Sequence, residues 1–510
     1  MSSRNLKGFW GLFVLVMLWG MQTQAEPRHA RLSAAIHRPM LSPARHFPRP
    51  MAERTPFRFK TPPVQPVEAG KPRPKTWLPH KKHRVSSQAP AVLPQPAPPS
   101  DEPPPAGEIP VRWAKPAHPG QFVKIFAAPT FSSANIGELR SHSALLVGET
   151  QTTRSGVCRT WLATIPVGFV CAAQVAIESG YLSSPPEREK STGWQRFRYG
   201  VVSALITKIQ GTGGRYLRKV LHRGDGVTVA KANGPSFELI GRERLPSKDV
   251  KVVTPPKAPT IDWASVPPGF RPGWVVPPVG EETVPLFFGT GDGEPVAYLP
   301  RYAVVYLAES ALVQKGRVSV TPKDAAALVA KGNRKPAWVA SAELQIEEPH
   351  LRRIVPATPP DSVSQDEPWI DIHLGQQVAT AYRGSKPVFA ALVSTGVAGA
   401  TPPGVFFIYR KYLSQTMANL AGAASQYDYR EVPHAQFFNG RIGLHAVLWH
   451  DNLGHAVSHG CVNLSPQAAE QFFAFTQPDL PVGWHTITLP SRKQPAPRSG
   501  LRGTVVQVRK

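Results

Sequence analysis

Cys461 and His445 are the residues whose types and spacing could perform chemistry. They stand sixteen residues apart, and Cys461 lies in the run 458–463, which reads SHGCVN. A cysteine thiolate is a strong nucleophile, and an imidazole can take the thiol proton and later return it to a leaving group. Attack on an amide carbonyl also needs hydrogen-bond donors for the developing oxyanion. Gly460 permits the close backbone approach that the amides around Cys461 would require, so the pair indicates cysteine-dependent acyl transfer.

Two elements must position this pair. Residues 442–449 predict a strand, whose alternation places His445 on one face and the aliphatic residues on the other. A turn at 450–454 then returns the chain toward Cys461, so we expect the two segments to lie side by side as a hairpin. Ser465 followed by proline predicts the start of a helix. A cysteine just ahead of a helix is expected to have a pKa below the free value of about 8.5.

The run SHGCVN, with a histidine sixteen residues earlier, resembles the signature of L,D-transpeptidases, the YkuD-like catalytic domain. Three further blocks share the resemblance: STG at 394–396, TPPGVF at 401–406 and FFNG at 437–440. The resemblance covers about 120 residues and implies a β-sandwich-like catalytic domain with short helices over 367–490. One departure is Ala446, where the family usually has Gly or Ser, although a backbone carbonyl there can still orient the imidazole.

The resemblance also implies a role for each matching residue. Cys461 would attack the meso-diaminopimelate carbonyl of a peptidoglycan tetrapeptide stem, with loss of the terminal D-Ala, and His445 would act as the base. His459 and Gly460 would shape the nucleophile loop and turn their amides toward the oxyanion, while Ser458 and Asn463 would hold the loop and contact substrate. No cofactor is implied. The acceptor amine stays open among a second stem peptide, an outer-membrane lipoprotein lysine and a free D-amino acid, with water as the hydrolytic alternative.

The N-terminus predicts export. Arg4 and Lys7 precede an uncharged apolar run at 8–21, and the small residues before residue 26 suit cleavage, so we expect a signal peptide at 1–25 and a periplasmic, wall-associated protein. An uncleaved anchor is the alternative. Export excludes nucleic acid as the partner of a chain whose net charge is +25. We expect a monomer.

The positive charge lies outside the catalytic segment. Residues 26–110 carry a net charge of +8, residues 111–360 carry +12 and residues 491–510 carry +6, whereas residues 361–490 carry −3. Such a distribution suits a polyanion of the wall or the membrane surface, and a solvated basic linker without a partner is the alternative.

The remaining chain divides by composition, and the fold class is mostly β. Short apolar runs between turn residues resemble a bacterial SH3-like barrel at 111–180, and a similar series recurs within 195–350, which predicts an internal duplication and one or two further small β modules there. The other segments are a Pro-rich, basic, disordered linker at 26–110, a Pro-rich joint at 351–366 and a basic tail at 491–510.

Three other readings compete with a transpeptidase. His445, His450 and His455 are evenly spaced, but this spacing lacks the paired cysteines of zinc clips, so we expect no metal and take the last two as exposed turn residues. A papain-like cysteine wall peptidase would place its cysteine before its histidine, the reverse of the order here. A non-catalytic peptidoglycan-binding scaffold would have no reason to keep both His445 and Cys461.

Cys158 and Cys171 are expected to pair, because they are near neighbours within one β-like segment of an exported protein. Two unpaired buried thiols are the alternative. Thiol labelling of the unreduced, denatured protein should therefore find one free thiol, at Cys461. Labelling of all three cysteines would remove the disulfide from the interpretation.

Overall fold

The computed structural model describes residues 111–510 except 119–120, 141–142, 154–155, 179–197, 212, 240–241, 289–292, 309–312, 323–343, 419–426 and 490–501. The expected signal peptide at 1–25 and linker at 26–110 lie outside the described residues, as does part of the second repeat. Strands dominate the described residues, which contain a single α-helix, so the mostly-β prediction is confirmed. No described helix is long and apolar enough to cross a membrane.

Two β-strand modules precede residue 254; the second has its own buried core, and the core of the first also includes residues of the C-terminal domain. The first module contains β1 (Arg112–Pro116), β2 (Val123–Phe126), β3 (Asn135–Leu139), β4 (Leu145–Thr152), β5 (Thr160–Thr164), β6 (Phe169–Cys171), the 3₁₀ turn η1 (Ala172–Gln174) and β7 (Val175–Ile177). The second module contains β8 (Arg198–Val202), β9 (Ile206–Gln210), β10 (Tyr216–His222), β11 (Gly226–Asn233), β12 (Ser236–Leu239), β13 (Arg244–Pro246), η3 (Ser247–Asp249) and β14 (Val250–Val253). The resemblance of these modules to SH3-like barrels stays a prediction.

A third module follows, after the short strand β15 (Ile261–Asp262) and the turn η4 (Trp263–Ser265). Its elements are β16 (Phe270–Val275), β17 (Thr283–Phe288), β18 (Ala297–Pro300), β19 (Val304–Ala308), β20 (Val313–Gln314), β21 (Arg317–Ser319), β22 (Thr321–Pro322), β23 (Leu344–Glu347), η5 (Glu348–His350) and β24 (Leu351–Arg353). Two small sheets enclose its core, so the described part of 195–350 holds two separate β modules.

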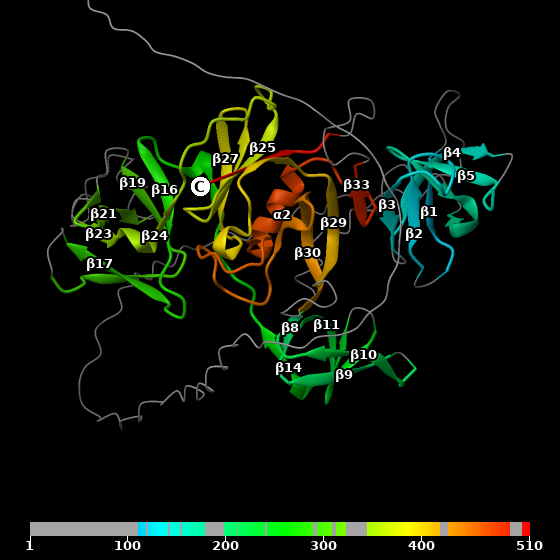
Figure 1. Ribbon diagram of the computed structural model, residues 1–510, viewed down its shortest axis with the longest axis horizontal. Coiled ribbons are helices and arrows are strands. Elements are labelled where there is room, and N and C mark those ends of the chain that lie inside the picture. The colour runs from blue at the N-terminus through cyan, green and yellow to red at the C-terminus, as the bar shows by residue number, and fades with distance from the viewer. Residues whose placement is uncertain are drawn as a thin grey trace, which may run out of the picture. The chain divides into compact units, whose positions relative to one another are not determined.

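The C-terminal domain is built from two runs of paired strands that share β27 (Figure 1). One run is β28–β34–β25–β26–β27, and the other is β27–β32–β31–β30–β29–β33. The bounds are β25 (Pro368–His373), β26 (Val378–Arg383), β27 (Lys386–Ser394), η6 (Val397–Gly399), β28 (Gly404–Phe407), β29 (Arg410–Ala418), β30 (Asp428–Asn439), β31 (Ile442–Ala446), β32 (Val462–Leu464), α2 (Pro466–Phe475), β33 (Thr486–Thr488) and β34 (Val505–Arg509).

Helix α2 fills the space between these two runs. It begins as the sequence predicts, because the Ser465 side chain accepts a hydrogen bond from the Ala468 amide and proline occupies the first turn. Its buried face, which includes Ala468, Ala469 and Phe472, joins apolar side chains of both runs in one core. Figure 1 shows the helix lying beside β29 and β30. The helix thus packs against β31 and β32, the two sheet strands next to the predicted pair.

The C-terminus corrects the predicted boundary of this domain. Residues 491–510 are predicted as a basic tail, but β34 lies inside the sheet, in parallel pairing with β25 and antiparallel pairing with β28. Val505 and Val506 are fully buried. The sequence prediction is dominated by the arginines and lysines of this segment and overlooks the apolar residues Val505, Val506 and Val508. The domain therefore extends to the end of the chain rather than to residue 490.

The Pro-rich joint at 351–366 is also not an open linker. Residues 351–353 form β24 of the third module, and Ile354 is buried. The Ala357 amide donates to the Tyr382 hydroxyl at 3.3 Å, and Ala357 and Val363 pack against Trp369 and its neighbours. Proline composition alone carries no information about these contacts, because they are made by chain segments that lie far apart in sequence.

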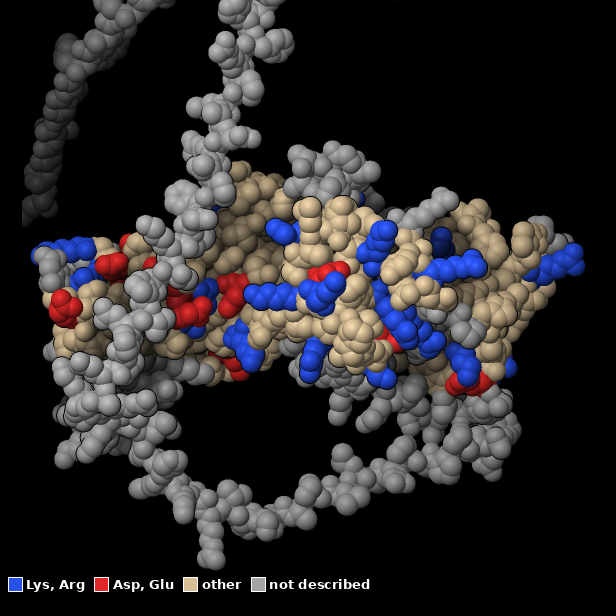
Figure 2. Space-filling view, turned by 90° about the horizontal axis from the view of Figure 1, so that it is seen from below, with Lys and Arg blue, Asp and Glu red and all other residues tan. Residues whose placement is uncertain are grey.

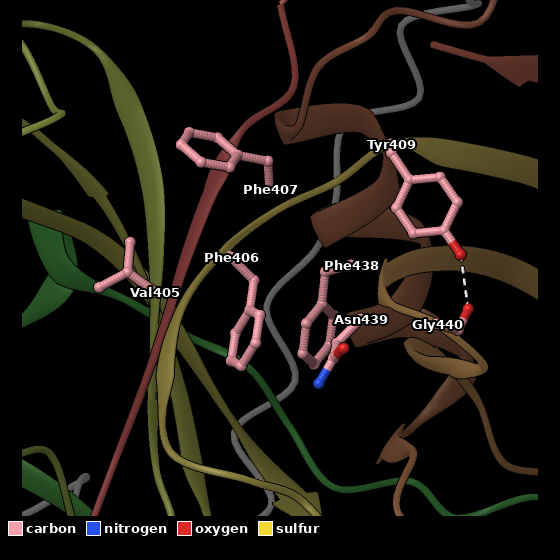
Figure 3. Close-up of a pocket in the computed structure, with 7 residues that line it drawn as sticks. All are labelled: Val405, Phe406, Phe407, Tyr409, Phe438, Asn439 and Gly440. Carbon is pink, nitrogen blue, oxygen red and sulfur yellow. Dashed lines mark hydrogen bonds between the residues drawn. The ribbon is translucent and has the colours of Figure 1, made fainter. Parts of the chain in front are cut away.

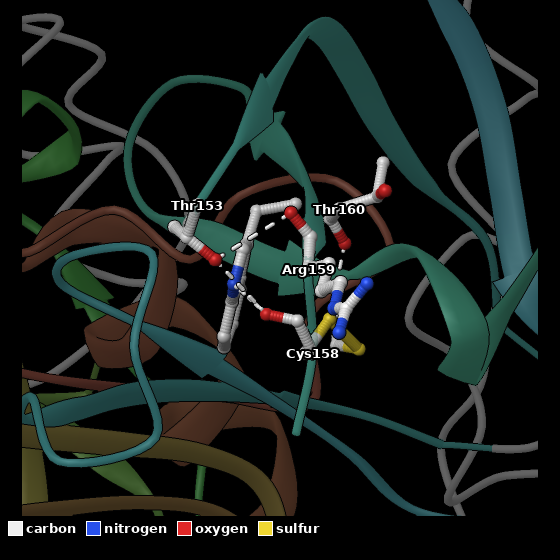
Figure 4. The surroundings of a disulfide bond; sticks show 6 residues. Thr153, Cys158, Arg159 and Thr160 are labelled. Atoms are coloured by element: carbon white, nitrogen blue, oxygen red, sulfur yellow. Dashed lines mark hydrogen bonds between the residues drawn. A yellow bond between two sulfur atoms is a disulfide. The ribbon is translucent and has the colours of Figure 1, made fainter. Parts of the chain in front are cut away.

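The disulfide of the first module is present. Cys158 and Cys171 are bonded across a sequence separation of 13 residues, with their Cα atoms 6.0 Å apart (Figure 4). The Cys158 carbonyl accepts hydrogen bonds from Trp161 Nε1 at 3.0 Å and from Thr153 Oγ1 at 3.1 Å. Cys461 is left as the free cysteine. The arrangement leaves one thiol for chemistry.

The ion pair between Arg509 and Asp371 should anchor β34 strongly. Arg509 Nε lies 2.8 Å from a carboxylate whose side chain is 1% exposed, and a second guanidinium nitrogen donates to the same carboxylate at 3.0 Å. Removing one partner of a buried pair leaves an uncompensated charge, so Arg509→Ala should lower the free energy of unfolding by about 3 kcal/mol. Chemical denaturation of the full chain would measure it.

Arg502→Ala is the matched control, because Arg502 pairs with Glu367 while its own side chain is 40% exposed. A partly exposed pair of this kind contributes about 1 kcal/mol or less. Equal losses for the two variants would show that burial of Asp371 does not decide the strength of the anchor.

Candidate active site

His445 and Cys461 come together through parallel strand pairing. β31 and β32 run parallel, with His445 opposite Asn463 and Leu444 opposite Val462. The expected hairpin is therefore wrong in direction, because the chain between the strands crosses over instead of turning back. Cys461 stands two residues before Asn463, on the same face as His445. Strand spacing of about 4.8 Å and a rise of about 3.3 Å per residue separate the two Cα atoms by about 8 Å, within reach of their side chains.

The protonation of His445 follows from the hydrogen bond of its ring to the Ala446 carbonyl. The side chain is buried, and its Nδ1 lies 2.9 Å from the Ala446 carbonyl oxygen. A carbonyl can only accept, so Nδ1 carries the proton and Nε2 is the unprotonated nitrogen. Burial lowers the pKa of His445 to about 4. The departure at Ala446 is therefore compatible with an oriented, neutral base, as the sequence predicts.

The Cys461 thiol does not have the lowered pKa that the sequence predicts. The residue is half-buried, its Sγ–H donates to the Arg441 carbonyl at 3.5 Å, and burial raises the pKa of the thiol. The Gly443 backbone and the Arg441 charge act in the opposite direction and do not overcome burial. The helix end is too distant to compensate, because β32 separates Cys461 from the first residue of α2.

The nucleophile loop is held by its own serine. Ser458 Oγ donates to the Cys461 carbonyl and accepts from the Gly460 amide at 3.0 Å. Ser458 thus holds the loop, but the Gly460 amide is engaged within it and does not point at a substrate oxygen. Gly460 has a φ of +138°, and a Cβ there would lie 3.0 Å from the Ala400 carbonyl oxygen, so glycine is required at this position.

Thr401 fastens the same loop from a distant segment. Its Oγ1 accepts from the Gly396 amide at 2.8 Å and donates to the Gly460 carbonyl at 2.7 Å, and the residue is fully buried. A parallel bridge between Gly396 and Ser458 reinforces this link. Sequence reasoning noted the blocks at 394–396 and 401–406 without assigning this role. The two blocks can be recognised in the sequence, but the contact of Thr401 with Gly460 is seen only in the structure.

Asn463 faces inward rather than toward a substrate. It is 3% exposed, and its Nδ2 lies 3.0 Å from Nε2 of His450. Burial lowers the pKa of His450 to about 4, so its imidazole is neutral, and its Nδ1 accepts a hydrogen bond from the Asn452 amide at 3.3 Å. Asn463 is predicted to contact substrate, but its buried side chain contacts His450 instead. His450 is predicted to be exposed, but it is partly buried by this contact. Within the described residues no three His, Cys, Asp or Glu side chains gather as metal ligands would.

Comparison with known proteins finds a match to the C-terminal part of the chain. Residues 367–508 match the family model of YkuD, the L,D-transpeptidase catalytic domain. The match includes β34 and covers Cys461, His445 and every residue of the nucleophile loop. No curated protein matched the chain.

Solved structures that resemble the chain include an L,D-transpeptidase from Stackebrandtia nassauensis, at 22% identity and a TM-score of 0.20, which covers 29% of this chain and 57% of that chain. A mutant of the Enterococcus faecium L,D-transpeptidase is 20% identical with a TM-score of 0.21, covering 29% and 50%. Mycobacterium tuberculosis L,D-transpeptidase 1 is 19% identical with a TM-score of 0.20, covering 28% and 63%. This chain thus spans about half to two thirds of each of these proteins.

An aromatic wall, formed by Tyr427, Tyr429 and Trp449, flanks the candidate site. The Tyr429 and Trp449 rings stack with centroids 3.8 Å apart, and the Trp449 ring lies 5.9 Å from that of His445. Tyr427 stacks on Tyr429 and lies 5.4 Å from the His459 ring. Burial, then the nearby Cys461, raises the pKa of Tyr427. The sequence offered no signal for this wall, since its members come from separate segments.

A pocket of about 280 Å³ is lined in part by Asn439 and Gly440, which directly precede Arg441. Figure 3 shows the rings of Phe406 and Phe438 facing each other there, and their centroids are 5.5 Å apart. The Tyr409 hydroxyl donates to the Gly440 carbonyl and closes one end. Because Arg441 contacts the thiol through its carbonyl, this pocket adjoins the backbone that supports Cys461.

The raised thiol pKa leads to a pH dependence that can be tested. Thiolate is the reactive form, so iodoacetamide alkylation of Cys461 in the folded protein should keep rising with pH above the free thiol pKa of about 8.5, and should stay slow at pH 7. His445→Ala should change this rate less than about twofold, because a neutral imidazole does not stabilise a resting thiolate. Fast alkylation at pH 6 that disappears in His445→Ala would instead reveal an ion pair.

Proposed function

We propose that residues 367–508 catalyse L,D-transpeptidation of peptidoglycan stem peptides in the periplasm. The observation that carries this proposal is the placement of His445 and Cys461 on one face of adjacent parallel strands, with a backbone acceptor that leaves His445 Nε2 unprotonated. The family match over 367–508 supports the same reaction class. The meso-diaminopimelate donor and the release of D-Ala belong to this proposal.

The reaction begins from a neutral pair. Cys461 Sγ attacks the meso-diaminopimelate carbonyl while His445 Nε2 takes the thiol proton. Proton transfer and attack occur together, so no free thiolate accumulates. The imidazolium then gives its proton to the departing D-Ala amine, which leaves a thioester on Cys461. An acceptor amine attacks this thioester, His445 removes a proton from that amine, and the thiol is restored. Because the Gly460 amide is engaged by Ser458, we assign the oxyanion to the amides of His459 and Cys461.

The electrostatics of the site favour this order of events. Burial lowers the pKa of His445 to about 4 and raises that of Cys461, and both shifts disfavour separated charges before substrate arrives. When substrate reacts, the amide donors stabilise its developing oxyanion, and this stabilisation offsets the cost of charging the buried pair. The enzyme is thus expected to be weakly reactive toward small electrophiles and selective for carbonyls that fit the site.

The charge of the chain is compatible with work at the cell wall. Figure 2 shows Lys and Arg side chains spread along the middle and right of one face, with acidic side chains gathered mainly toward the left. The net charge of +25 is confined to segments other than the slightly acidic residues 361–490. A basic surface attracts anionic polymers or membranes and would hold the enzyme near its substrate. The acceptor is an amine, from a stem peptide, a lipoprotein lysine or a D-amino acid.

Cys461→Ala and His445→Ala should each reduce turnover of a tetrapeptide stem by a factor on the order of 10³ or more. The double variant should lose little more, because nucleophile and base act as a unit. Mass spectrometry of muropeptides after incubation with peptidoglycan would measure turnover and identify the acceptor. A carbapenem should add one adduct to the wild-type mass that Cys461→Ala lacks.

His373→Gln is the control, because His373 ends β25 and lies apart from the pair in the sheet. It should keep wild-type turnover within about twofold. Turnover that persists in Cys461→Ala would rule out this assignment. Release of free tetrapeptide fragments cut elsewhere in the stem would favour the papain-like peptidase.

A further inference from the structure

The second module grips the segment that carries the aromatic wall. Gly226, at the start of β11, pairs in parallel with Tyr429. Next to it, the buried carboxylate of Asp225 accepts a hydrogen bond from the Asp428 amide at 2.9 Å through Oδ1. Its Oδ2 accepts from the His222 amide at 2.8 Å. One carboxylate therefore links the β10–β11 turn of the module to the first residue of β30.

Two further contacts continue this grip along β30. Thr228 Oγ1 donates to the Arg430 carbonyl at 3.2 Å, and the Arg430 guanidinium pairs with Glu243. The three successive residues 428, 429 and 430 are thus each held by the second module, through an amide, a strand pairing and a carbonyl. Contacts at consecutive residues set the position and the direction of a strand more tightly than one contact could.

The contact surface is closed around Gly226. A Cβ at this position would lie 1.9 Å from the Tyr199 hydroxyl and 2.6 Å from Cδ1 of Tyr429, so no larger residue fits between the two tyrosines. The Tyr199 ring also lies 6.2 Å from Trp449, the wall residue nearest His445. Burial and the nearby Tyr429, Asp428 and Asp225 raise the pKa of Tyr199. The module therefore reaches both stacked members of the aromatic wall.

We propose that Asp225 is a positioning residue of the active site, and that the second module, residues 198–253, completes the wall beside His445. The inference rests on the proposed transpeptidase function for its kinetic consequence, but the grip itself can be tested without activity. Asp225 acts through the backbone of Asp428, which sets Tyr429 against Trp449 and so shapes the side of the site that a bulky acyl donor must pass. Intrinsic reactivity of the Cys461 thiol does not depend on this wall.

Two variants of the full chain weaken the grip by different means. Asp225→Ala removes both acceptors, and Gly226→Ala inserts a methyl group between Tyr199 and Tyr429. Each should lower the second-order rate of Cys461 acylation by a carbapenem, and kcat/KM for the tetrapeptide, by about tenfold, with most of the loss in KM. Alkylation of Cys461 by iodoacetamide should change less than about twofold, because that reagent is small. Asp225→Asn keeps one acceptor oxygen and should lie between.

Gly213→Ala is the matched control, since it adds the same methyl group in the same module where no atom lies within 4 Å. It should behave as wild type in every assay. Hydrogen exchange of residues 427–430 supplies the readout that needs no activity. Exchange there should be faster by about tenfold or more in Asp225→Ala and Gly226→Ala, and unchanged in Gly213→Ala, because the Asp428 amide loses its acceptor or its register.

Each outcome decides the proposal. Unchanged exchange at 427–430, or acylation within twofold of wild type despite faster exchange, would overturn it. An equal fall in acylation and alkylation, together with a lower melting temperature, would overturn it in favour of a purely structural role. If the wild type is neither acylated nor active on tetrapeptide, the proposed function fails. In that case, faster exchange in both variants would still support the inference that the second module holds residues 428–430. Unchanged exchange would rule out that inference too.

Discussion

The parallel pairing of β31 with β32 is the interaction on which the rest of the catalytic domain depends. It sets His445 opposite Asn463 and brings Cys461 to the same face two residues earlier. Antiparallel β30 on one side and β27 on the other hold the pair inside the sheet, and α2 covers it. A slip of one residue in this register would turn either the thiol or the imidazole to the opposite face.

Burial of His445 and Cys461 favours the uncharged form of both side chains, and it also accounts for the many contacts around them. A neutral thiol and a neutral imidazole are the forms that a partly dehydrated site tolerates. The loop beside them must then be fixed by hydrogen bonds rather than by charge, and Ser458 and Thr401 supply those bonds. In the proposed reaction these bonds hold the loop in place before any proton moves, and substrate binding would start proton transfer.

The upstream modules are packed onto the catalytic domain as well as linked to it. β3 of the first module pairs with β33, and apolar residues of both contribute to one core. The third module contributes Tyr302, whose hydroxyl donates to Asp451 Oδ1 at 2.8 Å and accepts from the Leu453 amide at 3.1 Å, in the crossover that precedes the nucleophile loop. Such contacts make the modules part of the machinery that supports the site.

The sequence by itself determined the helix start at Ser465 and the mostly-β class, and it predicted the pair of His445 and Cys461. These features are written locally, in residue type, short spacing and capping, and such signals act within a few residues of where they stand. Tertiary structure decided the parallel direction of β31 and β32, the insertion of β34 into the sheet, the inward turn of Asn463 and the raised pKa of Cys461. Each of these features depends on segments that are distant in sequence and that bury a side chain or pair with a strand. Such contacts produce no periodic pattern in the sequence from which they could be predicted.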